Sequence, residues 1–265
     1  MKNPRRTFGP LLIVLLTSFL AARSAWCAIG IDAAIFTDQS KKNTTVTTPS
    51  FSTTSGNQLL LAFVAADNVS ATNSTVTAMS GGGLAWALVR RTNVQRGTAE
   101  IWRAFSINPL SAVSVTATLS QPVHSSITVM SFTGADTSGT NGSGAIGATA
   151  SANAPLGAPT ASLATTRDGS LVLGVGNDYD NAIARALGPG QTLVHQYLAP
   201  IGDTYWVQRQ TNTTSASGTN VTINDTAPTG DRYNLTLVEV LAMGTGGGST
   251  FTISGSITPA ASGGG

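Results

Sequence analysis

The chain has 265 residues, of which 41% are hydrophobic, 6% aromatic and only 10% charged, and its formal net charge is +2. Four of the fourteen basic residues and none of the twelve acidic residues fall within residues 1–27, so the remainder carries a net charge of −2. A weakly acidic chain offers no basic surface to nucleic acid or to an anionic membrane, and we expect neither as a partner.

Residues 1–27 have the three parts of a secretory signal peptide. A basic start precedes a twelve-residue apolar run at 11–22, which is too short to span a bilayer comfortably, and small residues follow it. Cleavage after Cys27 fits best, because the bulky Trp26 disfavours the alternative of a lipid anchor on this cysteine. Since Cys27 is the only cysteine, the exported part has no disulfide, which is typical of a bacterial secreted or cell-surface protein. After cleavage we expect no membrane insertion.

After this leader, the chain has the signature of an all-β fold. No window of eleven or more residues shows a convincing 3.6-residue apolar period, and short apolar or alternating runs recur between clusters of Gly, Asn, Asp and Ser. Pro49 lies inside one such run, and it places that strand at a sheet edge or ends it there. In the first half of the chain we expect strands at residues 29–36, 45–52, 58–65, 74–79, 85–91, 98–105, 113–119 and 126–132.

Two stretches repeat each other 111 residues apart, at residues 57–67 and 168–178. Each consists of a polar turn, an unbroken apolar run of strand length and an acidic turn, which suits a central strand buried on both faces. Weaker matches follow on both sides of this pair. We therefore predict one β-sandwich module over residues 28–243, built from pseudo-repeats at 28–136 and 145–243.

The two halves can combine in two ways. Each half can form its own immunoglobulin-sized sandwich, or both can interleave into one jelly roll with a pseudo-twofold axis. The short connector at residues 136–144, rich in Gly, Ser and Thr, and the continuous apolar strands favour one shared core. We expect an all-β, antiparallel β-sandwich of jelly-roll type.

The C-terminal segment has a different composition. Residues 244–250 read as a flexible Gly-rich linker, and residues 251–265 begin with the pattern of a first strand. Because one strand alone cannot bury its face or satisfy its backbone groups, we expect it to open a following module, with further covalent β-modules downstream.

Three short motifs resemble a duplicated β-sandwich module, of jelly-roll or immunoglobulin-like type, that is found in secreted multidomain bacterial proteins. They are the strand at Asn57–Ala62, the Glu-Ile-Trp strand at residues 100–102 and the turn that ends at Asp136. The similarity extends over residues 28–242, and it implies this fold together with display outside the cell or on its surface. Residues 251–259 look like the opening strand of the immunoglobulin-like or carboxypeptidase-regulatory-like repeats that often follow such modules. These motifs are structural, so the resemblance carries over no catalytic residue.

The sequence contains little catalytic chemistry. There is no Gly-X-Ser-X-Gly motif, and the two histidines belong to no visible Ser–His–Asp set. A glycoside hydrolase needs two neighbouring carboxylates, yet the only glutamates, Glu100 and Glu239, fall on different predicted strands. Glu100, beside Trp102, is the best single candidate for an acid that contacts a ligand. The alternative is that Glu100 forms an ion pair with an arginine such as Arg103 or Arg209.

A turn with carboxylate and amide oxygens follows the second of the two repeated apolar strands. Its residues Asn177, Asp178 and Asp180 carry the hard oxygen ligands that calcium prefers, and Asp67 occupies the equivalent turn in the first half. Calcium is therefore the candidate cofactor. The alternative is that these side chains only form Asx turns, which use the same residue types.

Carbohydrate binding uses exposed aromatic rings with polar neighbours. Trp102 and Trp206 hold matching places in the two halves, which favours core packing for both. Trp86 follows a Gly-rich turn and has no aromatic counterpart in the second half, and Tyr179 lies in the acidic turn. We therefore expect Trp86 and Tyr179 to be the exposed rings of a ligand-binding surface.

These patterns predict a secreted or cell-surface module without catalytic activity. We expect it to serve adhesion or carbohydrate binding within a larger protein, with a glycan or another cell-surface component as its partner. One alternative is a polysaccharide-active hydrolase or lyase of jelly-roll type that uses Glu100 or the turn at Asp178 and Asp180. The other is a structural spacer without a ligand. A groove shared by Trp86 and Tyr179 favours binding, whereas a second carboxylate near Glu100 favours hydrolysis.

Overall fold

Residues 28–244 are described by the computed structural model, and between them the backbone forms fourteen strands and one three-residue 3-10 helix. The expected signal peptide and the expected strand at 251–265 lie outside the described residues. All strand pairings are antiparallel, which confirms the predicted all-β, antiparallel sandwich class. Within residues 28–244, no helix has the length and hydropathy needed to cross a membrane.

The strand bounds divide between the two halves of the chain. The first half contains β1 (Gly30–Thr47), β2 (Gln58–Ala66), β3 (Val76–Gly81), β4 (Ala87–Thr92), β5 (Thr98–Ser106) and β6 (Val115–Thr133). The helical turn η1 (Ser143–Ala145) connects the halves. The second half contains β7 (Ile146–Gly157), β8 (Thr160–Ala164), β9 (Leu171–Asp178), β10 (Ala186–Leu187), β11 (Gln191–Leu198), β12 (Thr204–Gln210), β13 (Asn220–Ala227) and β14 (Asp231–Val240).

Both halves have the same strand order. The order is β1-β6-β2-β5-β4 in the first half and β7-β14-β9-β12-β11 in the second. The first part of β6 pairs with β3 and with the end of β1, just as β13 pairs with β10 and β8. If the long strands β1 and β6 are each counted as two segments, every half has eight segments with jelly-roll connectivity. The duplication of the sequence itself stays a prediction.

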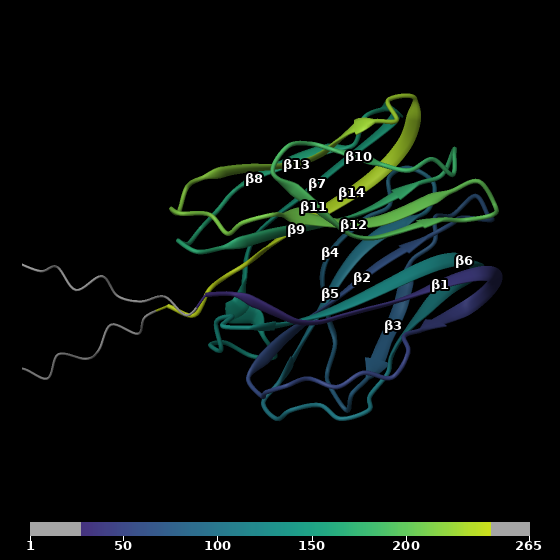
Figure 1. Cartoon of the computed structure of the whole chain (residues 1–265). Coiled ribbons are helices and arrows are strands. Elements are labelled where there is room, and N and C mark those ends of the chain that lie inside the picture. The colour runs from purple at the N-terminus through teal and green to yellow at the C-terminus, as the bar shows by residue number, and fades with distance from the viewer. Residues whose placement is uncertain (1–27, 245–265) are drawn as a thin grey trace, which may run out of the picture.

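The halves stack face to face and do not exchange strands between their sheets (Figure 1). A central core lies between the two large sheets, with Leu61 and Phe63 from the first half against Leu173 and Val207 from the second. Each half also has an outer core between its own two layers. The expected shared core is therefore present, but the expected interleaving into one jelly roll is replaced by two stacked jelly rolls.

The two repeated apolar runs form β2 and β9, the middle strands of their sheets, and both are buried on both faces. On β2, Leu61 faces the central core and Leu60 the outer core of its half. On β9, Leu171 faces the central core and Val172 the outer core. The 111-residue spacing would match Leu60 with Leu171, which face different cores. A shift of one residue turns every side chain to the other face of a strand, so the two strands correspond at an even spacing.

The two tryptophans that were expected to pack in the core do so, in the two outer cores. Trp206 is fully buried in the second half, and Trp102 is half-buried against the outer core of the first. The indole of Trp206 lies directly on the backbone of β9, where a Cβ at Gly176 would come within 2.1 Å of its Cζ2. Glycine at this position leaves the room that the ring fills.

Candidate functional site

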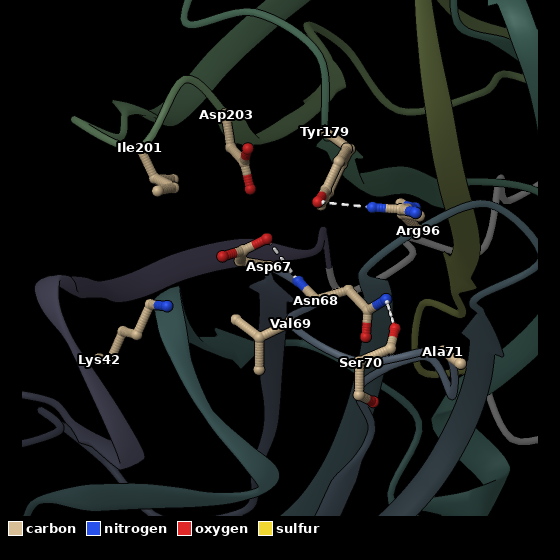
Figure 2. A pocket seen from close by; sticks show the side chains of 10 residues that line it. All are labelled: Lys42, Asp67, Asn68, Val69, Ser70, Ala71, Arg96, Tyr179, Ile201 and Asp203. Carbon is tan, nitrogen blue, oxygen red and sulfur yellow. Dashed lines mark hydrogen bonds between the residues drawn. The ribbon is translucent and has the colours of Figure 1, made fainter.

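A cavity of about 590 Å³ opens between the two halves, next to the C-terminal ends of β2 and β9 (Figure 2). We call it the seam cavity. The first half contributes β1, the loop after β2 and the loop between β4 and β5, and the second half contributes the turn after β9 and the loop between β11 and β12. The lining residues are Lys42, Asp67, Asn68, Val69, Ser70, Ala71, Arg96, Tyr179, Ile201 and Asp203. Two of the residues that the sequence singled out, Asp67 and Tyr179, are among them.

Polar contacts between the halves fix the loops around the seam cavity. The Asn177 side chain reaches from β9 to the carbonyl of Ala66, at 3.4 Å. The amide N–H of Gln95 donates to Asn234 Oδ1 at 3.0 Å, and Asn234 Nδ2 donates back to the carbonyl of Gln95 at 3.1 Å. Gly97, with φ 85°, allows this approach, because a Cβ there would lie 2.5 Å from Asn177 Oδ1. The loop between β4 and β5, which places Arg96 on the cavity wall, is thus held to the second half.

Asp67 and Asp203 face each other across the seam, one from each half (Figure 2). Both are buried, with exposed fractions of 3% and 2%, and they lie close enough for each carboxyl group to shift the pKa of the other. The backbone N–H of Asn68 donates to Asp67 Oδ1 at 2.5 Å, and the Tyr205 hydroxyl donates to Asp203 Oδ2 at 2.7 Å. Two carboxyl groups this close cannot both ionise without mutual repulsion.

The environment places the proton of this pair on Asp203. Burial raises the pKa of Asp203 to about 8, and the neighbouring charges of Asp67 and Asp178 raise it too, against the hydrogen bond from Tyr205. Burial also raises the pKa of Asp67, but the Asn68 N–H and the nearby charges of His124 and Lys42 oppose this. The pair therefore presents a carboxylic acid beside a carboxylate near neutral pH.

The rest of the wall mixes donors, acceptors and apolar groups. Arg96 Nη1 donates to the Tyr179 hydroxyl at 3.0 Å, and its guanidinium lies 5.2 Å from the centre of the tyrosine ring. Lys42 contributes an ammonium group from β1. The aliphatic side chains of Val69 and Ile201 are both exposed at the wall. A ligand with several hydroxyl groups could bond to the polar groups of the wall, and its C–H groups could contact the aliphatic side chains.

Three of the four predicted calcium ligands are engaged elsewhere. Asp178 forms a buried ion pair with Arg185, and burial raises the pKa of Asp178 to about 6. Asp180 pairs with Arg232 at 2.6 Å, and Asn177 bridges the halves. Of the four, only Asp67 lines the seam cavity. The described part of the chain has no group of three or more His, Cys, Asp or Glu placed to hold a metal, and calcium binding stays a prediction.

Glu100 is fully buried on β5 and does not line the seam cavity. Its carboxylate takes an ion pair from Arg91 at 2.8 Å, a bond from the Val76 N–H at 2.7 Å and one from Trp102 Nε1 at 3.0 Å. Glu100 therefore forms the ion pair with an arginine that we gave as the alternative to ligand contact. The partner is Arg91, and not Arg103 or Arg209. The other glutamate, Glu239, is also buried and accepts bonds on its own half.

Trp86 and Tyr179 are not brought together. Trp86 packs against the outer core of the first half, and its Nε1 donates to the carbonyl of Gly81 at 3.2 Å. It lies just before β4, whereas Arg96, the neighbour of Tyr179, lies beyond the other end of that strand. Only the tyrosine lines the seam cavity.

Sequence reasoning missed the partner of Asp67. Asp203 lies in a short loop 136 residues further along the chain and belongs to neither repeated stretch. One signal was present, because an acid two residues before the buried Tyr205 is within reach of its hydroxyl. The pairing across the seam depends on how the halves stack, which the motifs do not specify.

Comparison with family models, with curated proteins and with solved structures gave no match to this chain. The conclusions about the site accordingly rest on its geometry.

Proposed function

We propose that this protein is a non-catalytic carbohydrate-binding module, displayed outside the cell or on its surface, and that the seam cavity is its binding site. The observation that carries this proposal is the lining of the cavity. Its volume of about 590 Å³ falls within the range of small-molecule sites, roughly 300–1,000 Å³. Its wall combines carboxyl, amide, ammonium and guanidinium groups with aliphatic edges, and sugars present hydroxyl groups and C–H faces together.

Each part of the wall has a role in this proposal. Asp67 and Asp203 provide acceptors and one donor for hydroxyl groups, and Lys42 adds donors from β1. Ile201, 49% exposed, offers an aliphatic contact to the C–H face of a sugar ring. The Tyr179 ring, whose hydroxyl accepts a hydrogen bond from Arg96, fixes the shape of the wall beside that arginine.

The carboxyl pair favours binding over glycoside hydrolysis. Retaining and inverting glycosidases hold their two carboxyl groups roughly 5–9.5 Å apart, to leave room for the sugar carbon or for water. Asp67 and Asp203 each shift the pKa of the other, and we take them as a directly interacting pair without room for a sugar carbon or a water between them. Glu100, the other candidate acid, is saturated with protein donors.

A glycan array followed by titration calorimetry on the full chain, with and without calcium, tests the proposal. We expect Ile201→Ala to weaken binding several-fold, because it removes an aliphatic contact at the wall. Ile183→Ala is a matched control, since Ile183 is 48% exposed and does not line the cavity. If no glycan binds, or if both variants weaken binding equally, the seam cavity is not a sugar site. Release of shorter sugars during the assay would support the hydrolase instead.

A further inference from the structure

The two buried acids of the seam cavity, Asp67 and Asp203, each have one carboxyl oxygen without a protein donor within residues 28–244. Each comes from a different half, and each has one oxygen fixed by a protein donor, namely the Asn68 N–H for Asp67 and the Tyr205 hydroxyl for Asp203. Among the described residues, no N–H or hydroxyl group bonds to the second oxygen of either acid. Both acids line the seam cavity, where Figure 2 shows their carboxyl groups facing one another.

We infer that Asp67 and Asp203 act as one proton-sharing unit that recognises two neighbouring hydroxyl groups of a neutral sugar. This inference rests on the proposed function and names the ligand class of that site. A carboxylic acid beside a carboxylate offers one O–H donor and several acceptors in a small space. Two adjacent hydroxyl groups offer the complementary set, because each one both donates and accepts.

The charged and titratable groups around the pair support a single retained proton. Lys42 on β1 and His124 on β6 act on Asp67, and Tyr205 on β12 and Asp178 at the end of β9 act on Asp203. Arg96 and Tyr179 line the same cavity. The ammonium group of Lys42 stabilises one negative charge on the pair, whereas the buried Asp178 opposes a second.

The retained proton separates three classes of sugar. An anionic sugar would bring its carboxylate against the negative charge of the pair, and a cationic amino sugar would gain most only when both acids are ionised. A neutral sugar needs the donor, so its affinity should fall when the pair loses its proton. Since the pKa of Asp203 is raised to about 8, this loss should occur above about pH 8.

Calorimetry of the full chain between about pH 6 and pH 9.5 tests the inference, with methyl mannoside, glucuronate and glucosamine as probes. We expect the neutral glycoside to bind best below pH 8 and about tenfold more weakly at pH 9.5, since one buried hydrogen bond is lost. Asp203→Asn keeps a donor and an acceptor but cannot ionise, so its affinity should not change with pH. Asp203→Ala should weaken binding at every pH. Asp168→Asn, on an acid outside the cavity, is the control and should behave like the unmodified protein.

The outcomes separate this inference from the proposed function. If the neutral glycoside binds equally well at all pH values, or if Asp203→Asn abolishes binding, the proton-sharing unit is wrong while the sugar site stands. If none of the probes binds, the proposed sugar site is not supported. The pair is then tested by NMR titration of the aspartate carboxyl carbons. Two independent transitions near the ordinary pKa of 3.8 would overturn proton sharing, and one transition delayed to near pH 8 would support it.

Discussion

Replacing Asp203 by asparagine should stabilise the fold, and the gain should grow with pH. Burial, with Asp67 and Asp178 nearby, raises the pKa of Asp203 to about 8, from an ordinary value of 3.8. Between these values the folded protein holds a proton that the unfolded chain has lost. The stability of the unmodified protein should therefore decrease by about 1.4 kcal/mol per pH unit for this group. The stability that the protonated Asp203 contributes to the folded state is fully present below about pH 4, and it is lost once pH has risen through 8.

The difference of about four pKa units corresponds to on the order of 5 kcal/mol. Asparagine does not ionise, and it can donate to Asp67 while accepting from Tyr205, so the variant escapes this loss. Near pH 4 the variant and the unmodified protein should have similar free energies of unfolding. Near pH 8 the variant should be more stable by several kcal/mol.

Urea denaturation at intervals between about pH 4 and pH 9 measures this difference, since the free energy of unfolding extrapolates linearly to zero denaturant. Asp168→Asn serves as the control, because Asp168 is half-exposed and caps the Ser217 N–H at 2.7 Å. A gap between Asp203→Asn and the unmodified protein that stays constant with pH would refute the reasoning, because it would show that the proton is not held by this side chain.

Three further variants test the packing. Arg185→Ala should cost about 3–5 kcal/mol in urea denaturation, because it leaves the buried Asp178 without its cation. Gly176→Ala should cost about 1–3 kcal/mol and shift the fluorescence of Trp206, whose ring occupies the space of the added Cβ. Phe63→Ala, in the core between the halves, should cost about 3–5 kcal/mol, whereas Leu156→Ala at an exposed position should change stability by less than about 0.5 kcal/mol.

The strands were well predicted where the local pattern alone decides them. The predicted strands match β2 and β5 to within one residue, at 58–65 and 98–105. A short apolar run between turn residues, or an alternation of apolar and polar residues, favours a strand over a helix. The expected strands at 113–119 and 126–132 are instead one long strand, β6, that belongs to both layers of its half. The residues between them are polar, but the backbone continues as one strand, and after an irregularity it pairs with β1 again at Val123 and Ser125.

The register between the halves could not be taken from the sequence. The best match of residue types paired Leu60 with Leu171, since Leu, Val and Ala recur at neighbouring positions of both runs. Only the stacking of the halves shows that Leu60 faces an outer core and Leu171 the central one. Within a run of apolar residues, composition does not distinguish one face from the other.

The site was half predictable for a related reason. Asp67 and Tyr179 follow strands that are obvious from the sequence, so both could be expected at the same end of their sheets. Asp178, which looked equivalent to Asp67, is neutralised by Arg185 inside the second half. No local pattern distinguishes an aspartate that pairs within its half from one that meets a partner across the seam.

The contrast between these two buried acids is the strongest reason to look for function at the seam. A buried carboxylate is tolerated when a cation pairs with it, and Asp178 has Arg185. Asp203 has instead a hydroxyl donor and another acid, so its folded state becomes less favourable as pH rises through the neutral range. An asparagine would keep the hydrogen bonds without this loss. A residue that lowers stability where asparagine would fit, on the wall of a cavity, supports the proposal that this cavity binds a ligand.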